Sequence, residues 1–481
     1  MFYRFSDYGP PSYPFIGCII AFYNNRYRLL DWYTDLLAKS PTQTIVVQRL
    51  GARRTIVTAN PENIEHILKT NFNNFPKGKP FTEILGDLLG SGIFNVDGDL
   101  WHTQRKLASH GFTTKSLREF VLVALEDEVG TRLLPMLEKA AKTSEVIDLQ
   151  EVLKRFAFDV VCKFSLGIDP ACLEPSNVHA ISPLAKAFDI ASEISARRGA
   201  APVSLVWKIK RIFCISSEQQ LKEAIGDIHE FVTEIIKNKK KAIQETNNEE
   251  KNADLLTQLI LAGRDESFIR DMVISFIMAG KDTTSAAMTW LFWLLSRHPH
   301  IEKQLADEVK KTSNRTTKRF IEYEGLKEMR LLKACLCEGM RLYPPVAWDS
   351  KHALNNDTLP DGTMVRAGDR VTYFPYGMGR METLWGKNCF EFKPDRWFVE
   401  PDKEGGELRN VCPYKFPVFQ GGPRICLGKE MAFLQMKYLV GSVLDQFEIK
   451  PVGSGQPVFV PLLTAHMAGG LKVMVQPRSP R

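Results

Sequence analysis

The stretch Phe419-Gln-Gly-Gly-Pro-Arg-Ile-Cys-Leu-Gly428 surrounds a single cysteine with glycine, and the fold of the chain is organised around it. Gly421 and Gly422 permit backbone angles that residues with a Cβ reach only at a cost. A strongly helical segment, Lys429–Leu444, follows the loop. Backbone N–H groups that point at Cys426, where a helix begins, favour a thiolate over a thiol.

Such a thiolate serves either as a nucleophile or as a metal ligand. The loop holds no His or Asp that could act as a base, whereas the guanidinium of Arg424 suits an anionic group such as a haem propionate. Cysteine thiolate is one of the axial ligands of haem iron. A buried structural cysteine is the alternative. A phosphate-binding loop fits less well, because Gly422 and Gly428 enclose five residues instead of four and Glu430 replaces the Ser or Thr.

A second unusual stretch lies inside a predicted long helix, Asp265–Arg297, which ends before Pro299. The helix is apolar on nearly all sides until the run Ala279–Thr284, where glycine and adjacent threonines lower helix propensity. Small residues let a flat cofactor and O2 approach the backbone, and Asp282 beside Thr283 provides groups that relay protons. The alternative is that the threonine hydroxyl bonds back to its own helix.

These segments resemble the cytochrome P-450 superfamily. Residues 419–428 match its F-x-x-G-x-R-x-C-x-G loop, and residues 279–284 match its A/G-G-x-D/E-T-T motif. The resemblance implies haem b, iron protoporphyrin IX, with Cys426 as the metal ligand and Thr283 and Asp282 as the catalytic pair. The residues implied to bind the cofactor are Cys426, Arg424, Trp101, Arg105, Phe419, Gly422, Gly428 and Gly280.

The resemblance also implies the fold: mainly α with small β-sheets, a triangular helical domain plus a smaller β-rich lobe. It covers Tyr13 to Val475. Glu338 and Arg341 match the E-x-x-R pair of the superfamily, and Arg396 matches the arginine that joins that pair. We expect this triad to be structural, because a buried ion pair must be fully satisfied.

Local patterns predict several further elements. Thr44–Ala59 is typical of a hairpin, and Glu62–Thr70 is typical of a helix that begins after Pro61. Asn71–Gly98, rich in glycine and phenylalanine, is predicted to be a loop. Leu100–Ser109 is predicted to be a helix with Asp99 as its N-cap, and Leu331–Leu342 a further helix.

Composition excludes several classes of protein. The 481 residues carry a net charge of +7 and no basic tract with interleaved aromatics, so we expect no nucleic-acid partner. Nine scattered cysteines, an odd number, favour a reducing compartment without a disulfide framework. We divide the chain into a proline-rich hinge with an N-terminal remnant, 1–25, and a single monooxygenase domain, 26–481.

No stretch reaches the ~18 apolar residues that a membrane span requires. In microsomal members of the superfamily a proline-rich hinge follows an anchor helix, so we expect that the anchor is absent from this chain. By resemblance, we expect the protein at the cytosolic face of the endoplasmic reticulum membrane, in contact with the membrane surface.

The resemblance implies a monooxygenase that uses O2 and NADPH-derived electrons from NADPH-cytochrome P-450 reductase. Lys106, Lys429 and Lys437 are expected on the reductase-facing side, where opposite charges steer association. Two alternatives remain. One is a haem-thiolate enzyme that catalyses isomerisation or dehydration without O2, although such enzymes usually lack the acid–alcohol pair. The other is a haem-binding sensor without catalysis.

The runs RLYPPVAWDSKHA and PVFVPLLTAHMAGGLKV resemble a plant clan, the family numbered 94, that oxidises the terminal carbon of alkyl chains. The nearest resemblance is to its subfamily that hydroxylates jasmonoyl–amino-acid conjugates. Relatives in the clan act on fatty acids and some on sterol side chains, so the choice among these substrates stays open. The candidate substrate-pocket residues are Phe75, Phe94, Phe276, Val346, Ala347, Trp348, Leu462 and Leu463, together with Phe81 and Ile93.

Overall fold

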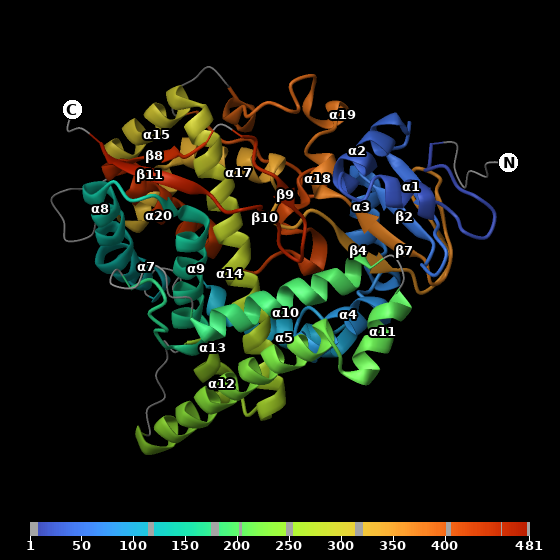
Figure 1. The fold of residues 1–481 in the computed structure, drawn as a ribbon, viewed down its shortest axis with the longest axis horizontal. Coiled ribbons are helices and arrows are strands. Elements are labelled where there is room, and N and C mark those ends of the chain that lie inside the picture. The colour runs from blue at the N-terminus through green and yellow to red at the C-terminus, as the bar shows by residue number, and fades with distance from the viewer. Residues whose placement is uncertain are drawn as a thin grey trace.

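The computed structural model describes residues 8–113, 120–174, 182–201, 204–246, 254–312, 321–400, 406–453 and 455–478. Helices dominate these residues, and their strands form four small sheets. Figure 1 shows the larger sheet and the N-terminal segments on the right, and the helices gathered to the left and below. The predicted class, mainly α with small sheets, is confirmed.

The central helix, α14 (Glu266–Arg297), crosses the molecule as one unbroken element, as predicted (Figure 1). Asp265 caps it by accepting a hydrogen bond from the N–H of Phe268 at 2.9 Å. Helix α9 (Leu149–Leu166) packs along it so closely that a Cβ at Gly280 would lie 2.5 Å from Val161 Cγ2. A glycine is therefore required in the middle of this helix, despite its low helix propensity.

A large apolar core forms where α14 meets α17 (Arg330–Leu342), α20 (Lys429–Gln446) and α15 (Pro299–Thr312). Inside it lies a buried carboxylate. Glu338 binds Arg341 Nε and Arg396 Nε, each at 2.8 Å, and accepts a hydrogen bond from Trp397 Nε1 at 2.9 Å. These contacts attach the segment that leads into the cysteine loop to α17.

The largest sheet has the order β1-β2-β7-β4, with β4 at an open edge. Strands β1 (Thr44–Val47) and β2 (Thr55–Thr58) form the predicted hairpin. Strand β7 (Arg370–Tyr373) runs parallel to β2 and antiparallel to β4 (Asp349–His352). The remaining strands are β3 (Ile147–Asp148), β5 (Asp357–Thr358), β6 (Met364–Val365), β8 (Phe447–Pro451), β9 (Phe459–Val460), β10 (His466–Met467) and β11 (Lys472–Pro477).

The prediction of a loop over Asn71–Gly98 is wrong, because α4 (Lys79–Leu89) lies within it. Leu85, Leu88 and Leu89 recur at helical spacing and are buried, and glycines flank them on both sides. The helix after this stretch, α5 (Gly98–Ser109), has Asp97 rather than Asp99 as its N-cap residue.

Other helices surround this frame, and none in the described part of the chain combines the length and apolarity needed to span a membrane. They are α1 (Ile19–Asn24), α2 (Leu29–Lys39), α3 (Pro61–Glu65), the π-helix η1 (His66–Thr70), α7 (Leu122–Glu128), the π-helix η5 (Val129–Leu133), α8 (Leu134–Thr143), α10 (Pro183–Ala200), α11 (Ser204–Phe213), α12 (Ser217–Thr246), α13 (Leu255–Leu261), α16 (Tyr323–Glu328), α18 (Pro375–Met378) and α19 (Glu382–Trp385).

Replacing the buried carboxylate of Glu338 tests how much its network of contacts contributes to the stability of the fold. Glu338→Gln leaves two guanidinium groups buried without a counter-charge, so we expect the free energy of unfolding to fall by about 3–5 kcal/mol. Urea unfolding followed by tryptophan fluorescence measures it. Glu328→Gln is the matched control, because its pair with Arg330 is exposed and contributes less than about 1 kcal/mol. Equal losses in the two variants would contradict a structural role for Glu338.

Candidate active site

A cavity of about 510 Å³ lies between α14, the cysteine loop and the β1-β2-β7-β4 sheet. Cys426 lines it on one side, and the run Ala279–Thr284 of α14 contributes Ala279, Gly280, Asp282, Thr283 and Thr284. Most of the remaining lining is apolar. The two unusual stretches of the sequence therefore meet in one space.

The shape of the cysteine loop depends on its glycines. Gly422 has a φ of +63°, and a Cβ there would lie 2.0 Å from the carbonyl oxygen of Leu68 in η1. A Cβ on Gly421 would lie 2.6 Å from the ring of Tyr414. The loop closes through a 2.8 Å hydrogen bond from the N–H of Cys426 to the carbonyl of Phe419. No other residue type fits at Gly422, because both its space and its φ exclude a side chain.

The Cys426 side chain is exposed, but the surface it presents faces the cavity. Burial within the protein raises the pKa of its thiol, and the N–H of Gly428 and the charges of Arg105 and Lys429 only partly offset this. The expectation that the loop alone favours a thiolate is therefore corrected. A bound metal ion deprotonates a coordinating thiol outright, so a cation at the sulfur would complete the site.

The residues predicted to meet propionates gather beside the sulfur. Arg424 Nη2 binds Asp97 Oδ1 at 2.6 Å, and its guanidinium lies 4.5 Å from the ring centre of Trp101. Arg105 lines the cavity and forms no ion pair with any described residue, and burial lowers its pKa. An unpaired guanidinium here is suited to a carboxylate of a ligand.

Two further cationic side chains in this cavity were not predicted from the sequence. Lys77 Nζ and Lys351 Nζ bind the two oxygens of Asp349 at 2.7 Å and 3.1 Å, and all three residues line the cavity. Burial lowers the pKa of Lys351 to about 7, although Asp349 opposes this. Lys77 lies in the stretch taken for a loop. The Asp-Ser-Lys alternation of β4, which places both charges on one face, was the available signal for Lys351.

The proposed catalytic pair makes specific contacts. Thr283 Oγ1 donates to the carbonyl of Ala279 at 2.8 Å, which is the bond back to its own helix. Asp282 Oδ1 accepts from Lys281 Nζ at 2.9 Å, and Lys281 also binds Asp189 of α10. Lys281 is 2% exposed, and its two carboxylate partners raise its pKa although burial would lower it.

Most candidate pocket residues line the cavity: Phe81, Ile93, Phe94, Phe276, Val346, Trp348, Leu462 and Leu463. Phe419, Gly428, Trp101 and Gly280 line it as well. Two candidates do not. Phe75 and Ala347 are buried in the apolar core behind the sheet. Of the lysines expected on a reductase-facing surface, Lys437 is buried and donates to the carbonyl of Leu326 at 2.6 Å, so that expectation is wrong.

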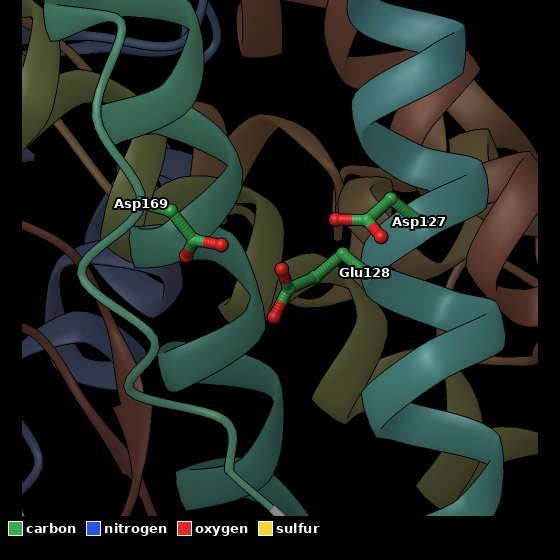
Figure 2. Close-up of side chains that lie close together, drawn as sticks. All are labelled: Asp127, Glu128 and Asp169. Atoms are coloured by element: carbon green, nitrogen blue, oxygen red, sulfur yellow. The ribbon is translucent and has the colours of Figure 1, made fainter.

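A cluster of carboxylates lies outside this cavity. Figure 2 shows Asp127 and Glu128 of α7 directed toward Asp169, in the segment after α9. Their oxygens could hold a metal ion, but Lys163 Nζ lies 2.8 Å from Asp127, 2.8 Å from Glu128 and 3.3 Å from Asp169. The ammonium group therefore supplies the cation, and burial raises the pKa of Glu128 to about 7.

The cavity fits an iron porphyrin. It offers one sulfur open to the interior, an unpaired guanidinium for a propionate, and a wall of small residues on α14. Residues 8–468 match the sequence profile of the family described as cytochrome P-450. These features together define a haem-binding oxidoreductase.

Comparison with known proteins identifies the group within this family to which the chain belongs. The chain is 60% identical over 475 residues to cytochrome P-450 94B1 of Arabidopsis thaliana, covering 98% of this chain and 92% of that one. It is 61% identical to cytochrome P-450 94B3 of the same plant (98% and 93%) and 44% identical to cytochrome P-450 94A1 of Vicia sativa (98% and 90%). The chain belongs to the cytochrome P-450 family, in the group numbered 94. It is a monooxygenase with haem b as its cofactor, and it uses O2 and a redox partner.

The steric requirement at Gly422 is open to test. Gly422→Ala forces the loop away from η1 and displaces Cys426, so we expect the ratio of Soret to protein absorbance to fall at least about threefold, since a Cβ cannot occupy this space without a backbone shift. Gly226→Ala, in a helix where a Cβ meets nothing within 4 Å, is the control. Normal haem content in the Gly422 variant would show that the loop tolerates the methyl group.

Proposed function

We propose that this protein hydroxylates the terminal carbon of an alkyl chain, with NADPH-cytochrome P-450 reductase as the electron donor. The observation that carries this is the placement of Asp282 and Thr283 in an apolar cavity that Cys426 also lines. The likeness of its sequence to a clan of terminal-carbon hydroxylases supports the choice of reaction. An isomerase or a sensor needs no acid–alcohol pair in this position.

The residues beside the sulfur have binding roles in this proposal. Cys426 would hold the iron of a haem, and Arg105, Arg424 and Trp101 would hold its propionates, with Lys77 and Lys351 adding positive charge. Bound haem supplies the activation of O2. Glu338, Arg341 and Arg396 act at a distance, by holding the chain that leads into the loop.

Two side chains manage protons. The Thr283 hydroxyl now donates to Ala279, so it must rotate to donate into the cavity. Asp282 connects to the surface through Lys281 and Asp189, whose side chain is 39% exposed. These contacts link Asp282 to a partly exposed carboxylate, so that Asp282 lies between the cavity and the surface. Lys281 is the residue that fixes where Asp282 points.

Selection of the terminal carbon is a matter of shape. Subterminal C–H bonds are weaker, so they must be held away from the reacting centre while the chain end approaches it. Val346 and Leu463 line the cavity from two separate segments and are the candidates for narrowing it. Ala347, expected to help, lies in the core and has no part in this.

Exposed apolar side chains in two segments support attachment to a membrane. Ile212 and Phe213 at the end of α11 are 77% and 68% exposed, and Phe15 and Tyr27 near the N-terminus are 96% and 88% exposed. Lys210 of α11 adds positive charge, which anionic headgroups attract, whereas Lys208 and Arg211 pair with Glu83 and Asp87. We propose that these segments lie at the cytosolic face of the endoplasmic reticulum membrane. Lys106 and Lys429 remain candidates for the reductase-facing side.

Removal of the hydroxyl tests the proton route. Thr283→Ala should retain the haem spectrum but divert electrons from product to hydrogen peroxide, because proton delivery becomes less controlled. The measurement is peroxide formed per NADPH consumed. Thr289→Ala, which removes a buried hydroxyl of the same helix outside the cavity, is the control. Full coupling of NADPH to product in the Thr283 variant would remove its assigned role.

Enlarging the cavity tests the selection of the terminal carbon. Val346→Ala removes two methyl groups from the lining, so subterminal carbons gain access and hydroxylation should move inward along the chain. Mass spectrometry of the products of dodecanoic acid gives the position. Val57→Ala, on the sheet side of the same cavity, is the matched control and should leave the position unchanged. An unchanged product in Val346→Ala would show that other residues set the position.

A further inference from the structure

Two arginines on the sheet side of the cavity lack acidic partners. Arg49 follows β1, Arg370 begins β7, and both line the cavity that contains Cys426. Arg49 Nη1 is buried and has no hydrogen-bond acceptor among the described residues. Arg370 donates from Nε to Ser350 Oγ at 2.9 Å. Among the residues that the structure describes, neither guanidinium forms an ion pair with a carboxylate.

Arg49 and Arg370 are half-buried, and a charge withdrawn from water is normally paired. By comparison, the buried side chains of Arg198 and Arg341 bind Glu218 and Glu338. Burial lowers the pKa of Arg370, and the positive charge of Arg49 lowers it further. Asp349 acts on Arg370 in the opposite sense, but Lys77 and Lys351 already occupy its oxygens. Two like charges left without a partner in a cavity indicate a site for an anion.

The two arginines are separate from the cations that would hold the propionates. Ser350 and Thr372 share a hydrogen bond of 2.9 Å and lie with Arg370 on one face of the sheet. Asp349 and Lys351 project from the opposite face, because successive side chains of a strand alternate. The cavity borders both faces of β4, the edge strand. One anion on the Lys351 face therefore cannot also satisfy Arg370 on the other, and the charge of Arg49 acts on Arg370.

Apolar and aromatic groups complete the surroundings. The Arg49 guanidinium lies 4.0 Å from the ring centre of Phe22, and Leu29, Val47 and Trp348 line the same part of the cavity. Tyr33 is adjacent, and burial raises its pKa to about 12, so its hydroxyl stays protonated and can donate. Two guanidinium groups and a hydroxyl donor that line one part of a cavity are the kinds of group that bind a carboxylate.

We propose that Arg49 and Arg370 bind the carboxylate of the substrate while its alkyl end extends toward Cys426. This inference rests on the proposed function and narrows it: the substrate is an amphiphilic acid, either a free fatty acid or an alkyl acid conjugated to an amino acid. A neutral sterol has no group that would satisfy the two arginines. Arg49 and Arg370 thereby determine specificity without touching the carbon that reacts.

The test measures equilibrium binding to the haem-loaded protein without NADPH, through the shift of the Soret band. The probes are dodecanoic acid and jasmonoyl-isoleucine, each beside its methyl ester, and cholesterol. We expect Arg49→Met and Arg370→Met each to weaken binding of at least one acid by about tenfold, as loss of a charge-assisted hydrogen bond implies, and to leave its ester within about twofold. The acid that loses more identifies the source of the carboxylate. Arg49→Lys should restore part of the affinity.

Two controls separate recognition from structure. Arg297→Met removes an exposed arginine at the end of α14, outside this cavity, and should change nothing. Thermal unfolding without ligand should show that Arg49→Met and Arg370→Met are as stable as the unmodified protein or more stable, because each removes an unpaired charge. A lower melting temperature together with weaker ester binding would assign the arginines to structure only, and would overturn the inference.

The outcome is independent of the reaction itself. Equal affinity of the unmodified protein for acids and esters, or tight cholesterol binding in every variant, overturns carboxylate recognition while terminal hydroxylation still stands. Oxidation at an inner carbon, or no NADPH-dependent product, contradicts the proposed function while the difference between acid and ester still stands. Failure of carboxylate recognition and failure of the proposed reaction therefore give different experimental results.

Discussion

A single buried carboxylate, Glu338, fixes the geometry on which the active site depends. Its two oxygens receive Arg341, Arg396 and Trp397, so the charge is satisfied without water. Those partners lie on α17 and in the chain that leads into the cysteine loop, and they set where the loop begins. The far end of the loop is set by α20. Cys426 is thus positioned by contacts outside its own ten-residue stretch, which leaves its sulfur free to face the cavity.

The cationic side chains that line the cavity differ in whether a carboxylate of the protein pairs with them. Beside the sulfur, Arg105 has no acidic partner in the part of the chain that the structure describes, while Lys77 and Lys351 share Asp349. Along α14, Lys281 binds both Asp189 and Asp282, so a buried ammonium orients the proposed proton donor. Lys163 is the counter-ion of the acidic cluster that includes Asp127 and Glu128 of α7, so these carboxylates need no metal ion to balance their charge.

The sequence predicted the fold and the central helix well, because the helix has a long, unbroken periodicity, and the two short motifs that the sequence singled out line one cavity. Predictions failed where the signal was masked or was non-local. Glycines on both sides hid the helical spacing of Leu85 and Leu89. Phe75 and Ala347 are apolar like their neighbours that line the cavity, and only tertiary packing places them in the core. Lys437 has the side chain of a surface residue, but α20 buries it against Leu326.

The position of β4 at the edge of its sheet has a consequence for molecular length. Lys351 of this strand lies on one face of the sheet, and Arg370 of the neighbouring strand β7 lies on the opposite face. If the outer arginines hold the head of an acid, its tail must pass around this strand before it arrives near the sulfur. The width of the β-strand then sets a minimum length for the alkyl chain of the substrate. Shorter chains do not reach the sulfur of Cys426, and longer chains bring only their terminal carbon near it.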